Sequence, residues 1–155
     1  MHETQAPDQA ATYRQIRWSG MDLLARREHS GWELEQKLVQ RYPDSLPLIE
    51  RVIHDLQDEL LQSDQRYTQA YVAMRRRKGY GPHRLMNELR EKGVDSEMVV
   101  EELNQPEHEW AEQAGLVLRK KFKAPASDFK ERSKQMRFLQ YRGFSHEQIR
   151  EVLQS

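Results

Sequence analysis

Residues 89–97 read LREKGVDSE, and residues 139–147 read LQYRGFSHE. In both stretches a Gly stands four positions after a Leu and is followed by one apolar residue and then by Asp or Ser. Glycine is common just beyond a helix end because it accepts a positive φ, and Asp or Ser is a preferred cap of the next helix. Each stretch therefore predicts a helix end followed directly by a helix start, and the two lie 50 residues apart.

The same spacing extends toward the N-terminus. Leu38 lies 51 residues before Leu89, and Tyr42-Pro43-Asp44-Ser45 takes the place of the glycine turn. An internal period of this length is typical of stacked helical units, each too small to bury a core alone. The period therefore predicts repeated units in which Leu38, Leu89 and Leu139 occupy equivalent core positions.

Helix signals surround these turns, whereas strand signals are nearly missing. Ser30 with Glu33 has the spacing of a capping box, and so has Ser145 with Gln148. Apolar residues recur at helical spacing within residues 49–56, and no segment alternates apolar and polar residues over six positions. These patterns predict an all-α protein.

We expect three tandem three-helix repeats that form an elongated, curved array, with a compact all-α bundle as the alternative shape. The first dozen residues show no periodicity, and unanchored chain ends are commonly disordered. The expected organisation is a flexible N-terminal segment over 1–14, repeat 1 over 15–60, repeat 2 over 61–105 and repeat 3 over 106–155.

Composition excludes several classes of protein. The 155 residues include no Cys, which rules out disulfides and thiolate chemistry. No apolar stretch approaches the roughly 18 residues that cross a membrane, and the start lacks the pattern of a secretory signal. We therefore expect a cytoplasmic protein without a membrane segment.

Charge is segregated along the chain although the formal net charge is zero. Residues 74–92 hold 7 basic and 2 acidic residues, and residues 119–155 hold 10 basic and 4 acidic residues. Residues 93–118, between them, hold 7 acidic residues and no Lys or Arg. Such blocks are either solvated helix faces or a stripe that faces a partner.

Catalytic and metal-binding patterns are missing from the sequence. Gly79 and Gly81 are followed by Pro82 and His83 rather than by the Lys-Ser/Thr of a phosphate-binding loop. The six histidines are scattered, and no His-x-x-x-His pair offers a metal face on a helix. We therefore expect no enzyme, no metal site and no cofactor.

The strongest local feature is the basic run Arg75, Arg76, Arg77 and Lys78, followed after the glycine turn by Arg84. Cations favour a helix C-terminus, and Gly79 with Tyr80 suits the cap. Capping accounts for one or two of these charges, and the surplus favours an anionic partner, either phosphates or an acidic protein surface.

A second group of basic residues lies in the last repeat and includes Lys120, Lys121, Arg137 and Arg142. Phe122, inside this run, suits either stacking on a base or the last core contact of its helix. Trp32 similarly suits either an exposed anchor or packing against a neighbouring helix.

The second repeat also carries a more specific pattern, which comprises Tyr71-Val72, Arg75, Lys78-Gly79-Tyr80-Gly81-Pro82, Arg84 and Glu88-Leu89. In this pattern the chain resembles the bacterial RecX family of RecA regulators. Residues 21–30 with Glu33-Leu34 and Lys37-Leu38 resemble the first repeat of that family, and Arg137-Phe138-Leu139, Arg142-Gly143-Phe144 and Ile149 resemble the last. The resemblance covers about residues 15–155.

One stretch departs from the family pattern. Where the family has Gly-aromatic-Leu-Asp-Asp-x-Arg-Phe, residues 60–67 read LLQSDQRY. The Gly is missing at Leu60, one Asp is Ser63, and the Phe is Tyr67. Ser63 can still cap the following helix, while the missing Gly leaves the angle between repeats 1 and 2 open.

The resemblance implies a non-enzymatic protein that binds RecA filaments on single-stranded DNA and inhibits their recombinase, ATPase and coprotease activities, in DNA repair, recombination and the SOS response. The partners would be the RecA filament and single-stranded DNA, bound directly or within the filament, and we expect a monomer. The expected contact surface comprises Arg75, Arg76, Arg77, Lys78 and Arg84, extended by Lys120, Lys121, Arg137 and Arg142. The alternative is a helix-turn-helix-like module that binds free DNA.

Overall fold

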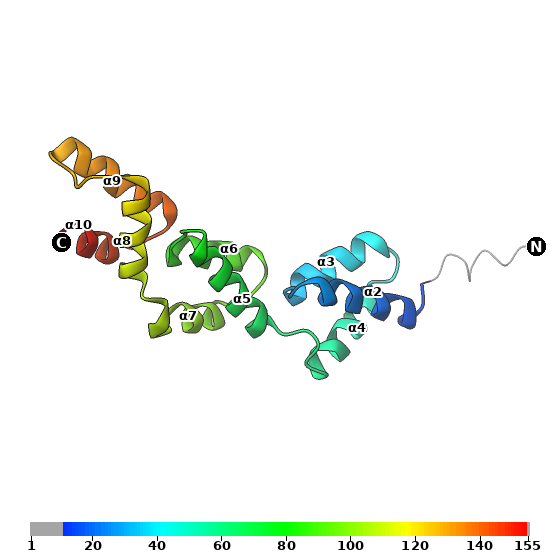
Figure 1. The fold of residues 1–155 in the computed structure, drawn as a ribbon. Coiled ribbons are helices and arrows are strands. Elements are labelled where there is room, and N and C mark those ends of the chain that lie inside the picture. Colours follow the sequence, from blue (N-terminus) through cyan, green and yellow to red (C-terminus); the bar gives the residue numbers. More distant parts are fainter. Residues whose placement is uncertain (1–10, 155) are drawn as a thin grey trace, which may run out of the picture. The chain divides into compact units, whose positions relative to one another are not determined.

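The computed structural model describes residues 11–154 and contains, within them, nine α-helices, one short 3-10 helix and no strand (Figure 1). The helices are α2 (Tyr13–Arg26), α3 (Gly31–Arg41), α4 (Leu46–Asp58), α5 (Asp64–Arg77), α6 (Pro82–Glu91), α7 (Ser96–Leu103), η1 (Pro106–His108), α8 (Trp110–Lys121), α9 (Phe129–Arg142) and α10 (His146–Gln154). The all-α prediction and the tandem three-helix arrangement are confirmed. Residues 1–10 of the expected flexible segment lie outside the described residues, and α2 begins at Tyr13.

Helix starts follow the caps that the sequence indicated. The hydroxyl of Ser30 accepts a hydrogen bond from the Glu33 amide at 3.0 Å, and Ser145 accepts one from the Gln148 amide at 3.1 Å. Ser63 caps α5 through the Arg66 amide at 3.1 Å. The structure contains one capping box that was not predicted, which is formed by Thr12 and Gln15 at the start of α2.

Helix ends follow the predicted glycines. Gly79, Gly93 and Gly143 all have positive φ, at 95°, 78° and 102°. At the end of α9 the amide of Phe144 donates to the carbonyl oxygen of Leu139 at 3.1 Å, and the Phe144 side chain is buried over this turn. The turn thereby satisfies carbonyl groups that a helix end leaves unpaired.

Leu60 occupies the position where the family pattern has Gly, and its φ is 62°. The amides of Leu61 and Gln62 both donate to the carbonyl oxygen of Leu56, at 2.9 and 3.1 Å. The turn after α4 is therefore built in the way a glycine would build it. A leucine in this conformation carries a steric penalty of about 1–2 kcal/mol.

The chain divides into two compact units. The first comprises the chain up to Thr68 together with Lys92–Val94. Its core lies between α2, α3 and α4 and consists of Ile16, Leu34, Leu38, Ile49, Val52, Ile53 and Leu56. Trp32 packs its Cβ side against Gly93 and leaves its ring half-exposed, so part of the side chain packs within the unit, and a role as an exposed anchor stays a prediction.

The second unit comprises Gln69–Glu91 and the chain from Asp95. In it α6 packs on α7, and α10 packs on α8 and α9. Leu89 and Leu139 are fully buried, as their equivalent positions predicted. The start of α6 meets the end of α9 through main-chain atoms, since the Gly81 amide donates to the Arg142 carbonyl oxygen at 2.7 Å and the His83 amide to that of Gly143 at 2.9 Å.

Candidate phosphate-binding and partner interface

Three guanidinium groups surround the ring of Tyr80 in the second unit. The Cζ atoms of Arg75, Arg84 and Arg142 lie 4.0, 4.5 and 5.1 Å from the ring centroid. Each distance is in the range of an attractive cation–π contact. Tyr80, which was expected only to cover the end of α5, therefore holds together arginines from α5, α6 and α9.

Glu88 forms ion pairs with two of these arginines. Arg75 donates to both carboxylate oxygens of Glu88, at 3.1 and 2.8 Å, and Arg84 donates at 3.1 Å. The Tyr71 hydroxyl donates a further bond at 2.7 Å. Burial raises the pKa of Glu88, but the bonds from Arg75, Tyr71 and Arg84 together outweigh burial, so the pKa lies below its ordinary value. Arg75 and Arg84 are thus engaged inside the unit.

Arg76 is also held by the fold. Its Nε donates to the carbonyl oxygen of His108 at 2.8 Å, and its own carbonyl oxygen accepts from the side chain of Gln113 at 2.9 Å. The His108 ring lies 2.8 Å from the Glu102 carboxylate and 5.1 Å from the ring of Trp110. Arg76 therefore ties the end of α5 to the η1 turn.

Five further basic residues of the two blocks line one cavity of about 400 Å³, which we call the basic cavity. Its lining comes from the end of α5 and from α8 and α9, and comprises Arg77, Lys78, Gly79, Gln113, Leu116, Val117, Lys120, Lys121, Phe138 and Arg142. Five of these residues are cationic and none is acidic. An uncompensated group of five cations with an apolar wall suits a bound anion such as phosphate.

Contacts of Arg142 and Phe138 fix the shape of the basic cavity. A guanidinium nitrogen of Arg142 donates to the Lys78 carbonyl oxygen at 3.1 Å, and a Cβ at Gly79 would lie only 2.9 Å from the same nitrogen. The ring of Phe138 lies 5.1 Å from the Arg142 guanidinium and 6.0 Å from the Lys121 ammonium. Phe122 meets Phe138 edge-on at 5.5 Å, which favours its packing role over base stacking.

Five of the nine predicted site residues therefore come together, namely Arg77, Lys78, Lys120, Lys121 and Arg142. Arg75, Arg76 and Arg84 have internal partners, and Arg137 is exposed on α9 outside the lining. Sequence reasoning did not assign Phe138 or Leu116 to the site. The only feature of the sequence that marked them was their apolar character at helical spacing along α8 and α9. Core residues show the same pattern, so it could not assign them to a site.

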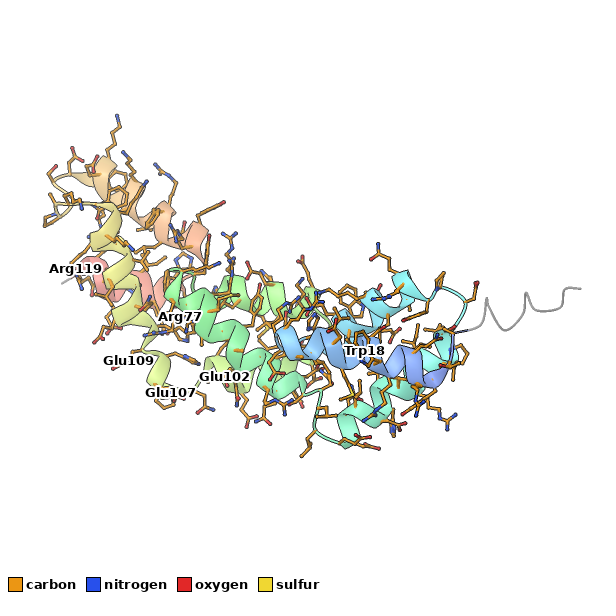
Figure 2. All side chains as sticks on the ribbon, turned by 45° about the vertical axis from the view of Figure 1, so that its right-hand side comes forward. Trp18, Arg77, Glu102, Glu107, Glu109 and Arg119 are labelled. Carbon is orange, nitrogen blue, oxygen red and sulfur yellow. The ribbon has the colours of Figure 1, made fainter. Side chains whose placement is uncertain are left out.

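The acidic block takes a different place in the second unit. Figure 2 shows Glu102, Glu107 and Glu109 along α7, η1 and the start of α8, with Arg77 on α5 and Arg119 further along α8.

In the described part of the chain, one group places three potential metal ligands together, His54, Asp55 and Asp58 on α4. Asp55 already accepts a hydrogen bond from the Tyr13 hydroxyl. Between residues 11 and 154, no helix is long and apolar enough to cross a membrane.

Fold and charge arrangement together define a tandem three-helix repeat protein with a basic cavity in its second unit. Residues 63–103 match the family model of the second three-helix domain of RecX, and residues 107–153 match that of the third. The chain belongs to the RecX family.

Relatives and solved structures agree with this assignment. The regulatory protein RecX of Pseudomonas entomophila (strain L48) is 41% identical over 140 residues, 89% of each chain. That of Ectopseudomonas mendocina (strain ymp) is 39% identical over 140 residues, 89% of this chain and 92% of the relative. The crystal structure of RecX from Lactobacillus salivarius has a TM-score of 0.78 over 92% of this chain and 94% of the other, at 22% identity, and shows the same fold.

Proposed function

We propose that this protein is a non-enzymatic regulator that binds RecA filaments on single-stranded DNA and inhibits their recombinase, ATPase and coprotease activities. Support comes from membership of a family whose relatives are named regulatory proteins and from the resemblance of the second repeat to the RecA regulators. On this proposal the protein acts as a cytoplasmic monomer in DNA repair, recombination and the SOS response.

The basic cavity is the observation that carries the proposal. Arg77, Lys78, Lys120 and Lys121 are exposed cations in a cavity without an acidic residue. A filament on single-stranded DNA offers phosphates, and Lys and Arg bind phosphates through charge-assisted hydrogen bonds. Phe138 has Arg142 and Lys121 near its ring and Phe122 at an edge, so the cavity suits a phosphate better than a stacked base.

The test measures ATP turnover by RecA filaments on single-stranded DNA, with this protein added well below equimolar. Wild-type protein should lower turnover. A double variant that carries both Arg77→Glu and Lys120→Glu should need about tenfold more protein, or more, for the same inhibition. The reason is that a hydrogen bond to a charged group contributes about 1.5–3 kcal/mol. Both residues are exposed, so the melting temperature should change little.

Arg119→Glu is the matched control. Arg119 is the residue before Lys120 on α8, is equally exposed, and lines a separate small cavity with Glu112 and Glu151. This variant should inhibit like wild type. Full inhibition by the Arg77→Glu, Lys120→Glu protein would show that the basic cavity is not part of the contact surface. The contact surface would then lie elsewhere on the protein.

The alternative is action on free DNA, and the same cavity supports it. Binding to free single strands should then weaken by about 0.7 log units per log unit of salt for each phosphate neutralised, or about 3–4 for five phosphates. ATP turnover would fall only when the protein is abundant enough to occupy the DNA. Inhibition far below equimolar, with weak binding to free DNA at the same salt concentration, would favour the filament.

A further inference from the structure

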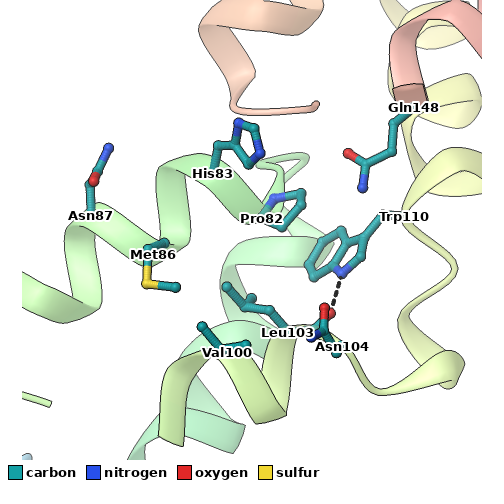
Figure 3. A pocket seen from close by; sticks show the side chains of 9 residues that line it. All are labelled: Pro82, His83, Met86, Asn87, Val100, Leu103, Asn104, Trp110 and Gln148. Carbon is teal, nitrogen blue, oxygen red and sulfur yellow. Dashed lines mark hydrogen bonds between the residues drawn. The ribbon is translucent and has the colours of Figure 1, made fainter. Parts of the chain in front are cut away.

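A groove of about 460 Å³ lies between α6, α7 and the start of α8 in the second unit (Figure 3). Its lining comprises Pro82, His83, Met86, Asn87, Val100, Leu103, Asn104, Trp110 and Gln148. None of these residues is Lys, Arg, Asp or Glu, and none belongs to the basic cavity. The groove is therefore a separate surface with different chemistry.

The floor of the groove is apolar and open. Met86, Val100, Leu103 and Trp110 lie around the same space in Figure 3. The Val100 side chain is 43% exposed, although it stands in the middle of a helix. The Trp110 indole is fixed because its N–H donates to the Leu103 carbonyl oxygen at 2.8 Å. A rigid aromatic wall with a methionine beside it can accept apolar side chains of several shapes.

Side-chain amides border this floor. Within residues 11–154, the side-chain amides of Asn87 and Asn104 have no hydrogen-bond partner, and the side chain of Gln148 uses only its oxygen, to accept from the Ser145 main-chain amide at 2.8 Å. An amide group can donate to one main-chain group and accept from another. Such groups beside an apolar floor suit an extended peptide, whose main chain needs partners on both sides.

An acidic flank runs beside the groove on α7. Glu97 and Glu101 lie about 60° and 100° around the helix from Val100. Both are exposed and, among the described residues, form no ion pair. Glu101 directly follows Val100 in the sequence, so its carboxylate is the one that best complements a basic side chain next to an apolar side chain at Val100.

We propose that this groove binds a short extended segment of a partner protein in which one large apolar side chain enters the floor beside Lys or Arg. The apolar side chain would contact Met86, Val100 and Trp110, and the neighbouring cation would lie near Glu101. This inference goes beyond the proposed function and does not depend on it, because it concerns a surface that shares no residue with the basic cavity.

The experiment uses full-length protein with labelled methyl groups, titrated with the blocked peptide Gly-Ser-Lys-Leu-Lys-Ser-Gly and observed by NMR. The methyl resonances of Met86, Val100 and Leu103 should shift along a saturating curve. Replacing the peptide Leu by Ala should weaken binding at least about tenfold, the effect of losing a buried Leu side chain. Replacing both peptide Lys by Gln should weaken it about two- to fivefold, as for exposed ion pairs.

Variants of the protein locate the binding. Val100→Lys should abolish the shifts, whereas Leu61→Lys should not, because Leu61 is similarly exposed (40%) but lies in the first unit. Glu101→Gln should erase the preference for Lys over Gln in the peptide. Glu112→Gln removes an equally exposed charge from α8 and should leave that preference intact.

Three results would overturn the inference. The first is equal affinity for the Lys peptide and a peptide with Glu in place of both Lys. The second is unchanged binding by Val100→Lys. The third is a change in the methyl resonances of the groove when only the protein concentration is raised, provided that this change disappears in Phe129→Ala. Phe129 is 83% exposed and stands next to Lys130. Such a result would mean that Phe129 of a second copy of this protein occupies the groove. None of these results bears on inhibition of ATP turnover through the basic cavity.

Discussion

Arg142, at the end of α9, donates a hydrogen bond to the main-chain carbonyl oxygen of Lys78 at 3.1 Å. These residues belong to the two basic blocks, which are separated in sequence by an acidic one. The bond holds a cation of the last repeat against the helix end that carries Arg77 and Lys78. The basic cavity therefore depends on how α5 and α9 meet, and substitutions at that junction should alter it.

The neighbouring contact, between the start of α6 and the end of α9, is sensitive to a single methyl group. A Cβ at Gly81 would lie 2.6 Å from the Gly143 carbonyl carbon, a main-chain atom that cannot turn aside. Gly81→Ala should lower the free energy of unfolding by about 2 kcal/mol or more, through overpacking. Gly115→Ala is the control, because its new Cβ would meet only the mobile end of Arg119 at 3.1 Å, and Ala favours a helix by about 0.5–1 kcal/mol. Urea unfolding should separate the two variants; equal stability would mean that the helices part readily at this point.

Leu60→Gly should stabilise the protein. Leu60 has a φ of 62° and an exposed side chain, so the substitution relieves backbone strain and loses little packing. Relief of about 1–2 kcal/mol is partly offset by the greater freedom of glycine in the unfolded chain, about 0.5–1 kcal/mol. A melting temperature raised by a few degrees is expected. A lower value, with helicity unchanged, would show that the turn after α4 is not strained.

Glu88 should make the protein less stable in acid. Its folded pKa is lowered, because bonds from Arg75, Tyr71 and Arg84 outweigh burial. A carboxyl group with a lowered folded pKa contributes stability above its unfolded pKa of about 4.3 and loses that contribution as pH falls through the folded value. Glu88→Gln should therefore reduce stability at pH 7 and flatten its decline below about pH 4.3. The exposed Glu101→Gln should leave the urea midpoint at pH 7 unchanged.

His29 should affect stability nearer neutrality. It is buried in the first unit, where its Nδ1 lies 3.1 Å from the Arg27 carbonyl oxygen and its Nε2 lies 2.9 Å from the Lys37 ammonium. Burial lowers its pKa, only partly opposed by the bond to Arg27. The unfolded chain then binds a proton more readily below about pH 6.5, so stability should fall as pH drops from 7 toward 5. His29→Asn should make this slope shallower, whereas His83→Asn, at an exposed histidine, should leave the urea midpoint at pH 7 unchanged.

Local features were predictable from the sequence, and interactions between distant residues were not. The caps at Ser30, Ser63 and Ser145 act within three residues, and the glycine turns act within five. The pairing of Glu88 with Arg75 requires the angle between α5 and α6, which no local pattern fixes. Only Arg84, four residues before Glu88 on the same helix, offered a sequence signal for this ion pair.

The basic cavity was predictable only in part, because its charges are visible in the sequence but its contacts join residues far apart in the chain. Charge blocks pointed to the residues, and their segregation indicated either solvated helix faces or a stripe that faces a partner. Which cations remain free depends on partners far along the chain, such as the His108 carbonyl oxygen for Arg76. The assignment of Arg77, Lys78, Lys120, Lys121 and Arg142 to an anionic partner stays a prediction until the charge reversals are measured.

The contact between Gly81 and Gly143 has a consequence for the evolutionary record of this fold. Both hydrogen bonds there join main-chain groups, the Gly81 amide to the Arg142 carbonyl and the His83 amide to the Gly143 carbonyl. Any side chain added at either glycine would collide with the opposite backbone or with Arg84, and no second substitution can make room by shrinking. Related sequences should hence keep both glycines without exchanging them in pairs. This contact between α6 and α9 should leave no trace in correlated mutations, and methods that infer contacts from covariation should overlook it.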